Sequence, residues 1–263
     1  INKGYRNFIV GIGGSATNDA GIGMLQALGF EFYDKNNKLV GLGGKVLNEI
    51  RHIKIENRLK ELDECKFKIA CDVNNPLFGK NGAAYIYGSQ KGATSEIIEE
   101  LDNGLRNFSK VVKIYLSKDV ANVEGAGAAG GLGFAFLAFL NSKLESGIKI
   151  ILEEIKLEEE LKDADFVITG EGRLDNQTAM GKAPIGVAKL AKKYGVKVIG
   201  LAGATTEDAV KCNEEGIDAY FSIVNRAMTI EEAMDKATAS ENMTATTTQI
   251  FNLITSIQQS KNM

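Results

Sequence analysis

The chain lacks tryptophan and has a single histidine, His52, among its 263 residues. One histidine argues against a histidine-bearing zinc site and against a Ser-His-Asp hydrolase, since a lone imidazole in a charged stretch lacks partners. Aromatic residues make up only 7% of the chain and the formal net charge is −3. Nucleic-acid binding needs stacking side chains and a basic surface, so we expect no nucleic-acid partner.

The chain is also poor in cysteine and in long apolar runs. Cys65, Cys71 and Cys212 form no Cys-x-x-Cys pair, which favours a reducing, cytoplasmic location. No stretch approaches the roughly 20 apolar residues that cross a membrane, and no signal peptide or Lys/Arg block is visible, so we expect no membrane association. The sequence starts at Ile1 inside what resembles the approach to a strand, so we expect that the beginning of the natural protein is absent.

Glycine, by contrast, is abundant and clustered. Three of the five glycine-rich stretches follow runs of β-branched residues, and a strand that leads through a glycine loop into a helix is the usual cradle for phosphate. The sequence therefore predicts a protein that handles a phosphorylated small molecule. The stretches are 11–19, 41–44, 125–133, 169–175 and 200–203, of which the first, fourth and fifth follow such runs.

The order of the predicted elements indicates an α/β protein. From residue 163 on, strands and helices alternate as β-α-β-α-β, which favours a Rossmann-like domain with a parallel, doubly wound sheet. We expect one α/β domain over 1–155 and another over 156–263, although the first strand, loop and helix (1–30) could belong to either. Predicted strands are 8–12, 30–33, 66–72, 166–169, 196–201 and 220–224; predicted helices are 20–28, 94–116, 130–140, 148–161, 185–194 and 207–215. Thr94 and the pair Thr229 and Glu232 are predicted helix caps, and Asn18 or Asp19 could cap the helix at 20–28.

Several of these motifs together resemble the bacterial glycerate kinases of the type I family, and they occur in that family's order. The resemblance implies an ATP-dependent, magnesium-assisted enzyme that phosphorylates D-glycerate, in most members to 2-phosphoglycerate. It also implies two α/β domains with the active site in the cleft between them; a homodimer is compatible with the sequence, which does not fix the oligomeric state. The motifs are 13–19, 70–77, 90–93, 125–133 and 169–175 with 181–184.

The chain departs from the family pattern at a few places. Glu124 stands where the family usually has proline, Ala20 replaces a glycine, and Ser89 replaces a proline. Two further family motifs, Asp-Ser-[Phe/Tyr]-Lys and Asp-Gly-Gly-Glu-Gly, do not occur in the sequence. A catalytically incomplete, nucleotide-binding fragment is therefore one alternative to a complete kinase.

The first glycine loop offers backbone donors for an anion. Gly13, Gly14 and Ser15 lie between a predicted strand and a predicted helix, so their N–H groups could face a phosphate, or the glycines could simply form a tight turn. No Walker A motif occurs, because Ala183 follows the Gly-Lys pair at 181–182. Any ATP site is therefore not of the P-loop class.

Acidic and basic residues gather in the fourth glycine stretch. We predict Asp175, Glu171 and Lys182 as catalytic residues, with Asp175 either holding Mg²⁺ or accepting the proton of the substrate hydroxyl, and Glu171 able to share either role. Arg173 and Lys182 could neutralise phosphate or the glycerate carboxylate. The alternative is a solvated loop with ion pairs.

Other candidates lie beside the remaining motifs. Asp72 follows a strand and could bind glycerate hydroxyls, or it could cap a turn; Lys91 is a candidate phosphate contact. Asp19 could be a second metal ligand or a helix N-cap. Gly127 and Gly130 belong to a stretch that could form another anion cradle, or could let a helix pack closely against its neighbours.

The sequence keeps an oxidoreductase open as a rival interpretation. Residues 11–16 fit the Gly-x-Gly-x-x-Gly/Ala pattern of a dinucleotide-binding turn, and Asp34 follows at the end of the next predicted strand. In such folds that acidic residue binds the ribose of NAD.

Overall fold

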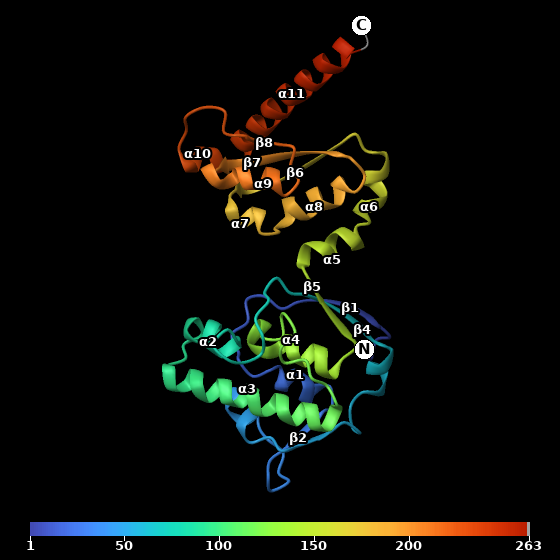
Figure 1. The fold of residues 1–263 in the computed structure, drawn as a ribbon, viewed down its shortest axis with the longest axis vertical. Helices are drawn as coiled ribbons and strands as arrows, with labels where there is room; N and C mark the ends of the chain where they lie inside the picture. Colours follow the sequence, from blue (N-terminus) through green and yellow to red (C-terminus); the bar gives the residue numbers. More distant parts are fainter. Residues whose placement is uncertain (262–263) are drawn as a thin grey trace. The chain divides into compact units, whose positions relative to one another are not determined.

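The computed structural model describes residues 1–261, and its internal contacts divide the chain between Ile150 and Ile151 (Figure 1). Both units combine helices with a parallel sheet, so the predicted α/β class is confirmed. Within the described residues, no helix is both long and apolar enough to cross a membrane. We describe each unit by itself.

The first unit is built on a parallel sheet with strand order β1-β4-β5 and a separate antiparallel pair, β2 with β3. The initial strand, loop and helix lie in this unit, because β1 pairs with β4. Its elements are β1 (Asn7–Gly11), α1 (Ile22–Ala27), β2 (Glu31–Tyr33), β3 (His52–Lys54), β4 (Lys66–Ala70), α2 (Ala83–Tyr87), α3 (Ser95–Leu116), α4 (Ala128–Phe139) and β5 (Ser142–Glu145), with α5 (Gly147–Glu154) crossing the division.

Helix α3 illustrates why the sequence folds as it does here. The Thr94 hydroxyl accepts a hydrogen bond from the amide of Ile97, so the predicted N-cap is confirmed. Apolar residues recur every three or four positions and face the core, where Phe108 stacks on Phe139 and meets Phe134 edge-on. This packed aromatic cluster fixes α3 and α4 against each other.

Helix α1 begins later than predicted, and neither Asn18 nor Asp19 is its N-cap. Ala20 and Gly21 both adopt left-handed conformations, with φ of 50° and 67°, so a helix cannot run through them. The cause is a close contact with the start of α4, where the carbonyl oxygen of Gly130 accepts a hydrogen bond from the amide of Ala20 at 2.9 Å. The helix therefore starts at Ile22.

The second unit holds a parallel sheet in the order β6-β7-β8, covered on both faces. Val198 and Ala202 of β7 face a core that includes Ile185 of α8, whereas Ile199 and Leu201 face Ile250 of α11; Figure 1 shows these helices on opposite sides of the sheet. The elements are α6 (Leu157–Glu160), β6 (Phe166–Leu174), α7 (Asn176–Ala179), α8 (Ala183–Lys192), β7 (Lys197–Thr205), α9 (Lys211–Glu214), β8 (Ala219–Ser222), α10 (Ile230–Met234) and α11 (Lys236–Lys261).

Two of the predicted glycine loops are strand instead. Residues 169–174 belong to β6 and residues 200–203 belong to β7, and the two strands pair along this length. A Cβ on Gly170 would overlap the carbonyl oxygen of Leu201, so glycine here serves close pairing of the two backbones. The predicted helix at 148–161 is also interrupted, because Lys156 adopts a left-handed φ of 55° between α5 and α6.

Candidate active site

The carboxyl edge of the first sheet gathers two of the segments that were predicted to bind ligand, the loop after β1 and the loop after β4. Gly11 at the end of β1 pairs with Ala70 of β4, which pairs in turn with Glu145 of β5. The segments that follow these strands therefore leave the sheet at the same edge, where ligands bind in parallel α/β sheets. Gly13 and Gly14 are exposed there, and a Cβ on either would contact nothing.

Lys91 lies across this first glycine loop. Its Nζ donates hydrogen bonds to the Ser15 hydroxyl at 2.9 Å and to the Thr17 carbonyl oxygen at 2.6 Å. Burial lowers the pKa of Lys91, and the nearby carboxylate of Asp19 opposes that shift. The fold therefore brings Lys91 close to Ser15 and Asp19, which lie more than 70 positions earlier in the sequence.

Asp19 and Lys91 border a small open cavity of about 270 Å³. Asn18, which is 8% exposed, lines it, and both polar atoms of its amide are buried without a hydrogen-bond partner. The Asp19 carboxylate accepts a hydrogen bond from the Gly21 amide at 3.1 Å through Oδ1. The lining residues are Ala16, Thr17, Asn18, Asp19, Gly43, Gly44, Gly88, Lys91, Gly92, Ala93, Ile97 and Leu101.

Three other candidates from the first unit have structural partners. Asp72 accepts a hydrogen bond from the Gly147 amide at 3.0 Å, at the start of α5. Gly127 and Gly130 are buried, and a Cβ on them would overlap the carbonyl oxygens of Pro76 and Thr17. Gly127 and Gly130 therefore serve close packing of backbone segments, which was the alternative to an anion cradle, because the absence of a side chain lets the backbones touch.

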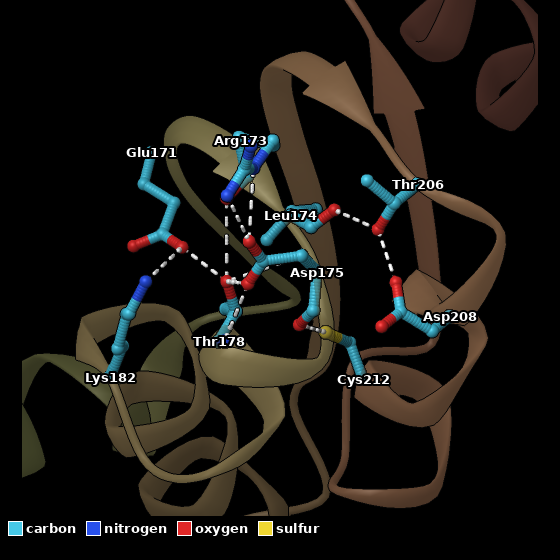
Figure 2. A network of polar contacts seen from close by, with 9 residues as sticks. All are labelled: Glu171, Arg173, Leu174, Asp175, Thr178, Lys182, Thr206, Asp208 and Cys212. Carbon is cyan, nitrogen blue, oxygen red and sulfur yellow. Dashed lines mark hydrogen bonds and ion pairs between the residues drawn. The ribbon is translucent and has the colours of Figure 1, made fainter.

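In the second unit, Asp175 lies at the centre of a polar network (Figure 2). It is the N-cap of α7: its Oδ1 accepts a hydrogen bond from the Thr178 amide at 3.1 Å. Its Oδ2 accepts hydrogen bonds from the Arg173 guanidinium, at 2.9 Å from Nε and 2.8 Å from Nη2. Asp175 is buried whereas the Arg173 side chain is 61% exposed, so the carboxylate holds a guanidinium that faces solvent.

Glu171 joins the same network through Thr178. The hydroxyl of this fully buried threonine donates to the Glu171 carboxylate, and the Lys182 ammonium lies 4.0 Å from the same carboxylate oxygen (Figure 2). Lys182 is itself the N-cap residue of α8. Four predicted residues, 171, 173, 175 and 182, are therefore brought together around one buried hydroxyl.

The network holds Asp175 as an anion. The hydrogen bond from the Thr178 amide, followed by the hydrogen bond and charge of Arg173, keeps the pKa of Asp175 below its ordinary value of 3.8. A general base works best with a pKa near the operating pH. Asp175 is thus a weaker proton acceptor than an ordinary aspartate and is better suited to orienting Arg173.

The two predicted magnesium ligands, Asp19 and Asp175, differ in how well they could bind the ion. Among residues 1–261, no three His, Cys, Asp or Glu side chains are grouped as a metal site, but Mg²⁺ is usually held by one or two carboxylates together with substrate phosphates. The described hydrogen bonds of Asp19 engage only Oδ1, which leaves Oδ2 for a cation. Both oxygens of Asp175 are engaged, and one of them faces a guanidinium. Of the two, Asp19 fits the ion better.

Comparison with known proteins identifies the family of this chain. The family model described as "Glycerate kinase family" matches residues 1–255. The chain belongs to the glycerate kinase family. The suspected resemblance is therefore confirmed, and it covers nearly the whole sequence.

Named relatives of this family member support the assignment. The chain is 49% identical over 251 residues to glycerate 2-kinase of Escherichia coli (strain K12), covering 94% of this chain and 66% of the relative. It is 49% identical over 236 residues to glycerate kinase of Halalkalibacterium halodurans, covering 90% and 62%. A crystal structure assigned to glycerate kinase 2 from Salmonella typhimurium LT2 superposes with a TM-score of 0.82 at 43% identity, covering 98% of this chain and 66% of that one. The chain thus spans somewhat under two thirds of the length of these relatives.

The rival dinucleotide site is inconsistent with the topology of this glycerate kinase family member. A Rossmann fingerprint needs the next strand to lie parallel in the same sheet, but β2 pairs antiparallel with β3, and β1 pairs with β4. Asp34 accepts hydrogen bonds from the amides of Asn36 and Lys38, so it closes a turn. The oxidoreductase interpretation is therefore wrong.

Sequence reasoning missed two polar residues that the fold places in these sites. Thr178 bridges Glu171 and Asp175, and its signal was present: Asp at 175 and Thr at 178 have the spacing of a capping box. Asn18 was considered only as a helix cap. Nothing in its spacing indicates that its amide is buried beside a cavity, because that arrangement depends on residues 44, 91 and 130.

Proposed function

We propose that the chain catalyses phosphoryl transfer from ATP to a hydroxyl of D-glycerate, with Mg²⁺, and that the product is 2-phosphoglycerate. The observation that carries the proposal is membership of the glycerate kinase family over residues 1–255, with a named glycerate 2-kinase 49% identical over 94% of the chain. The two polar sites supply the kinds of group that such a transfer needs.

Phosphoryl transfer depends mainly on positioning and on neutralising charge. In the first unit, the exposed Gly13 and Gly14 and the half-buried Ser15 offer backbone N–H groups, and the Lys91 ammonium lies beside Ser15. In the second unit, Arg173 and Lys182 present exposed cationic groups held by Asp175 and Glu171. We propose that Arg173 and Lys182 neutralise the charge of the transferred phosphoryl group.

Each residue has a role in this proposal. Asp175 orients Arg173, whose planar guanidinium suits bidentate contact with phosphate oxygens. Glu171, hydrogen-bonded to Thr178 and 4.0 Å from Lys182, is the carboxylate placed to accept the proton of the substrate hydroxyl. Bound Mg²⁺, for which Asp19 is the better ligand, would neutralise the charge of the nucleotide phosphates. Asp72 is a hydroxyl-binding candidate through the oxygen that does not cap α5.

The test is glycerate-dependent release of ADP by the purified chain, followed with a coupled enzyme assay in the presence of Mg²⁺. The proposal expects ADP release that requires D-glycerate and ceases when glycerate is replaced by L-lactate. A chain that binds ATP in calorimetry but releases no ADP with glycerate would contradict the proposal and support the alternative of a catalytically incomplete, nucleotide-binding fragment.

A further inference from the structure

The Asn18 side chain is an anomaly in the first unit. Both its Oδ1 and its Nδ2 are buried without a hydrogen-bond partner among the described residues, and Asn18 is one of the residues that line the cavity beside Lys91. Nearly all buried polar atoms in folded proteins are hydrogen-bonded, so an exception calls for an explanation. An amide that is satisfied only when a ligand arrives is one such explanation.

The backbone around Asn18 is held from two sides. A Cβ on Gly44 would overlap the Asn18 carbonyl oxygen, and a Cβ on Gly130 would lie 2.6 Å from the Asn18 Cα. The backbone of this segment therefore has no room to shift, and rotation about the side-chain bonds of Asn18 is what brings its amide to a ligand in the cavity. Two glycines from separate segments, Gly44 and Gly130, thus fix the backbone that carries the unpaired amide.

The groups around Asn18 indicate what the ligand carries. Lys91 donates only to two neutral oxygens, from Ser15 and Thr17, and lies within ion-pair distance of no carboxylate in the described part of the chain. An ammonium without a paired anion favours a carboxylate or phosphate. An amide that both donates and accepts favours a hydroxyl. Asp19, on the same cavity, adds a carboxylate that can accept from a hydroxyl.

The size of the cavity favours the smaller of the two substrates. Its volume of about 270 Å³ lies below the roughly 300–1,000 Å³ of pockets that enclose drug-sized ligands. A three-carbon hydroxy acid fits such a space, whereas a nucleoside triphosphate does not. The apolar side chains of Ile97 and Leu101 on one wall suit the carbon chain of a small acid.

We propose that this cavity is the binding site for a small 2-hydroxy acid, in which the Asn18 amide pairs with the hydroxyl and Lys91 with the carboxylate. The choice of glycerate as the acid rests on the proposed function. The site assigns Lys91 to the acceptor substrate, in place of the predicted contact with nucleotide phosphate, and makes Asn18 a specificity-determining residue.

The test compares Asn18→Leu and Asn18→Asp with the unaltered chain, using calorimetric binding of D-glycerate without nucleotide and of MgATP without glycerate. Leucine has the branched shape of asparagine, with bulkier methyl groups, and needs no hydrogen bonds, whereas aspartate keeps the shape and repels a carboxylate. Lys91→Met removes the cation and keeps the stem. Asn103→Leu and Lys110→Met, both on exposed positions of α3, are the matched controls.

We expect Asn18→Leu to weaken glycerate binding by about 10–100-fold, the effect of losing hydrogen bonds in a desolvated site, and Asn18→Asp to weaken it further. Binding of MgATP stays within about 2-fold, and the controls bind both ligands normally. Because the amide is unsatisfied in the free chain, Asn18→Leu also keeps or raises the melting temperature, by roughly 2–4 °C if about 1 kcal/mol is recovered.

Unchanged glycerate affinity in the Asn18 variants, or no glycerate binding by the unaltered chain, would overturn the inference. Loss of MgATP affinity instead would assign the cavity to nucleotide phosphate and overturn it too. The outcome is separable from that of the proposed function. Glycerate binding that depends on Asn18 in a chain that transfers no phosphate supports this site and refutes the kinase proposal; normal transfer with an unaltered KM in Asn18→Leu does the reverse.

Discussion

Replacing Gly130 with alanine tests the contact that forms the first candidate site. Gly130 opens α4 with φ of 68°, and a Cβ there would overlap the carbonyl oxygen of Thr17 and approach the Cα of Asn18 to 2.6 Å. Those neighbours are backbone atoms that have no rotamer to change. Gly14 has nearly the same φ, 70°, but a Cβ there meets nothing within 4 Å. Comparing Gly14→Ala with Gly130→Ala therefore separates the cost of a left-handed backbone from the cost of steric overlap with neighbouring atoms.

The expected losses differ for the two variants. A left-handed alanine costs about 1–2 kcal/mol, and the more restricted unfolded chain returns about 0.4–1 kcal/mol. Gly14→Ala should thus lower the free energy of unfolding by roughly 0.5–1 kcal/mol. Gly130→Ala adds the cost of overpacking, about 1–3 kcal/mol, for a total of roughly 1.5–4 kcal/mol.

The measurement is urea unfolding followed by far-UV circular dichroism, since the chain has no tryptophan to report by fluorescence. Because a chain of two units need not unfold in a single step, hydrogen exchange of amides in residues 1–150 assigns the loss to the first unit. If Gly130→Ala and Gly14→Ala cost the same within about 0.5 kcal/mol, the close approach of α4 to the glycine loop is refuted.

The second unit yields three further predictions, and the proposed metal a fourth. Asp175→Asn should lower kcat by about 10²–10³-fold without loss of the folded signal, because Arg173 loses its orientation; a well-folded variant with normal turnover would refute that role. Because folding lowers the pKa of Asp175 from its ordinary value of 3.8, its carboxylate stabilises the fold at pH values above 3.8, and this contribution is lost as the pH falls through the folded-state pKa. The difference in urea midpoint between the unaltered chain and Asp175→Asn should therefore be constant above pH ~5 and shrink below pH 3.8. A difference that does not change with pH down to the acid limit would contradict this. Lys182→Ala should raise the KM for ATP or glycerate by about 10-fold whereas Lys193→Ala, an exposed lysine of the same unit, should not; equal kinetics of the two variants would count against Lys182. Excess chelator should abolish turnover and added Mg²⁺ should restore it, and full activity in chelator would remove the metal from the mechanism.

Much of the fold follows from local sequence signals. The capping residues Thr94, Thr229 and Glu232 each hold the predicted hydrogen bonds, because a cap depends on residues three positions apart. The strand at residues 8–12 corresponds to β1, displaced by one residue. Parallel pairing in the second unit was likewise foreseeable from the alternation of strands and helices.

Other features depend on contacts between distant segments. Gly170 and Gly203 indicated loops, but pairing of β6 with β7 places both in strands. Ala20 has a left-handed φ because Gly130 approaches it, and at this position the resembled family has glycine. Strand β5 was not predicted: its four residues, Ser142–Glu145, acquire extended structure from pairing with β4.

The residues of the candidate sites also fall into those predictable from local sequence and those that depend on contacts between distant segments. Residues 171, 173, 175 and 182 lie within one short stretch, so their convergence around Thr178 was predictable in outline. Lys91 meets Ser15 across 76 positions, and no local pattern reports such a distance. The orphaned amide of Asn18 likewise depends on tertiary packing.

The most direct test of the central claim is phosphorus NMR of the reaction product. The purified chain is incubated with MgATP and D-glycerate, and the spectrum is compared with those of authentic 2- and 3-phosphoglycerate. The account predicts a new phosphomonoester signal that matches 2-phosphoglycerate and grows as the γ-phosphate signal of ATP declines. A spectrum in which ATP remains intact, or in which only inorganic phosphate appears, would contradict it.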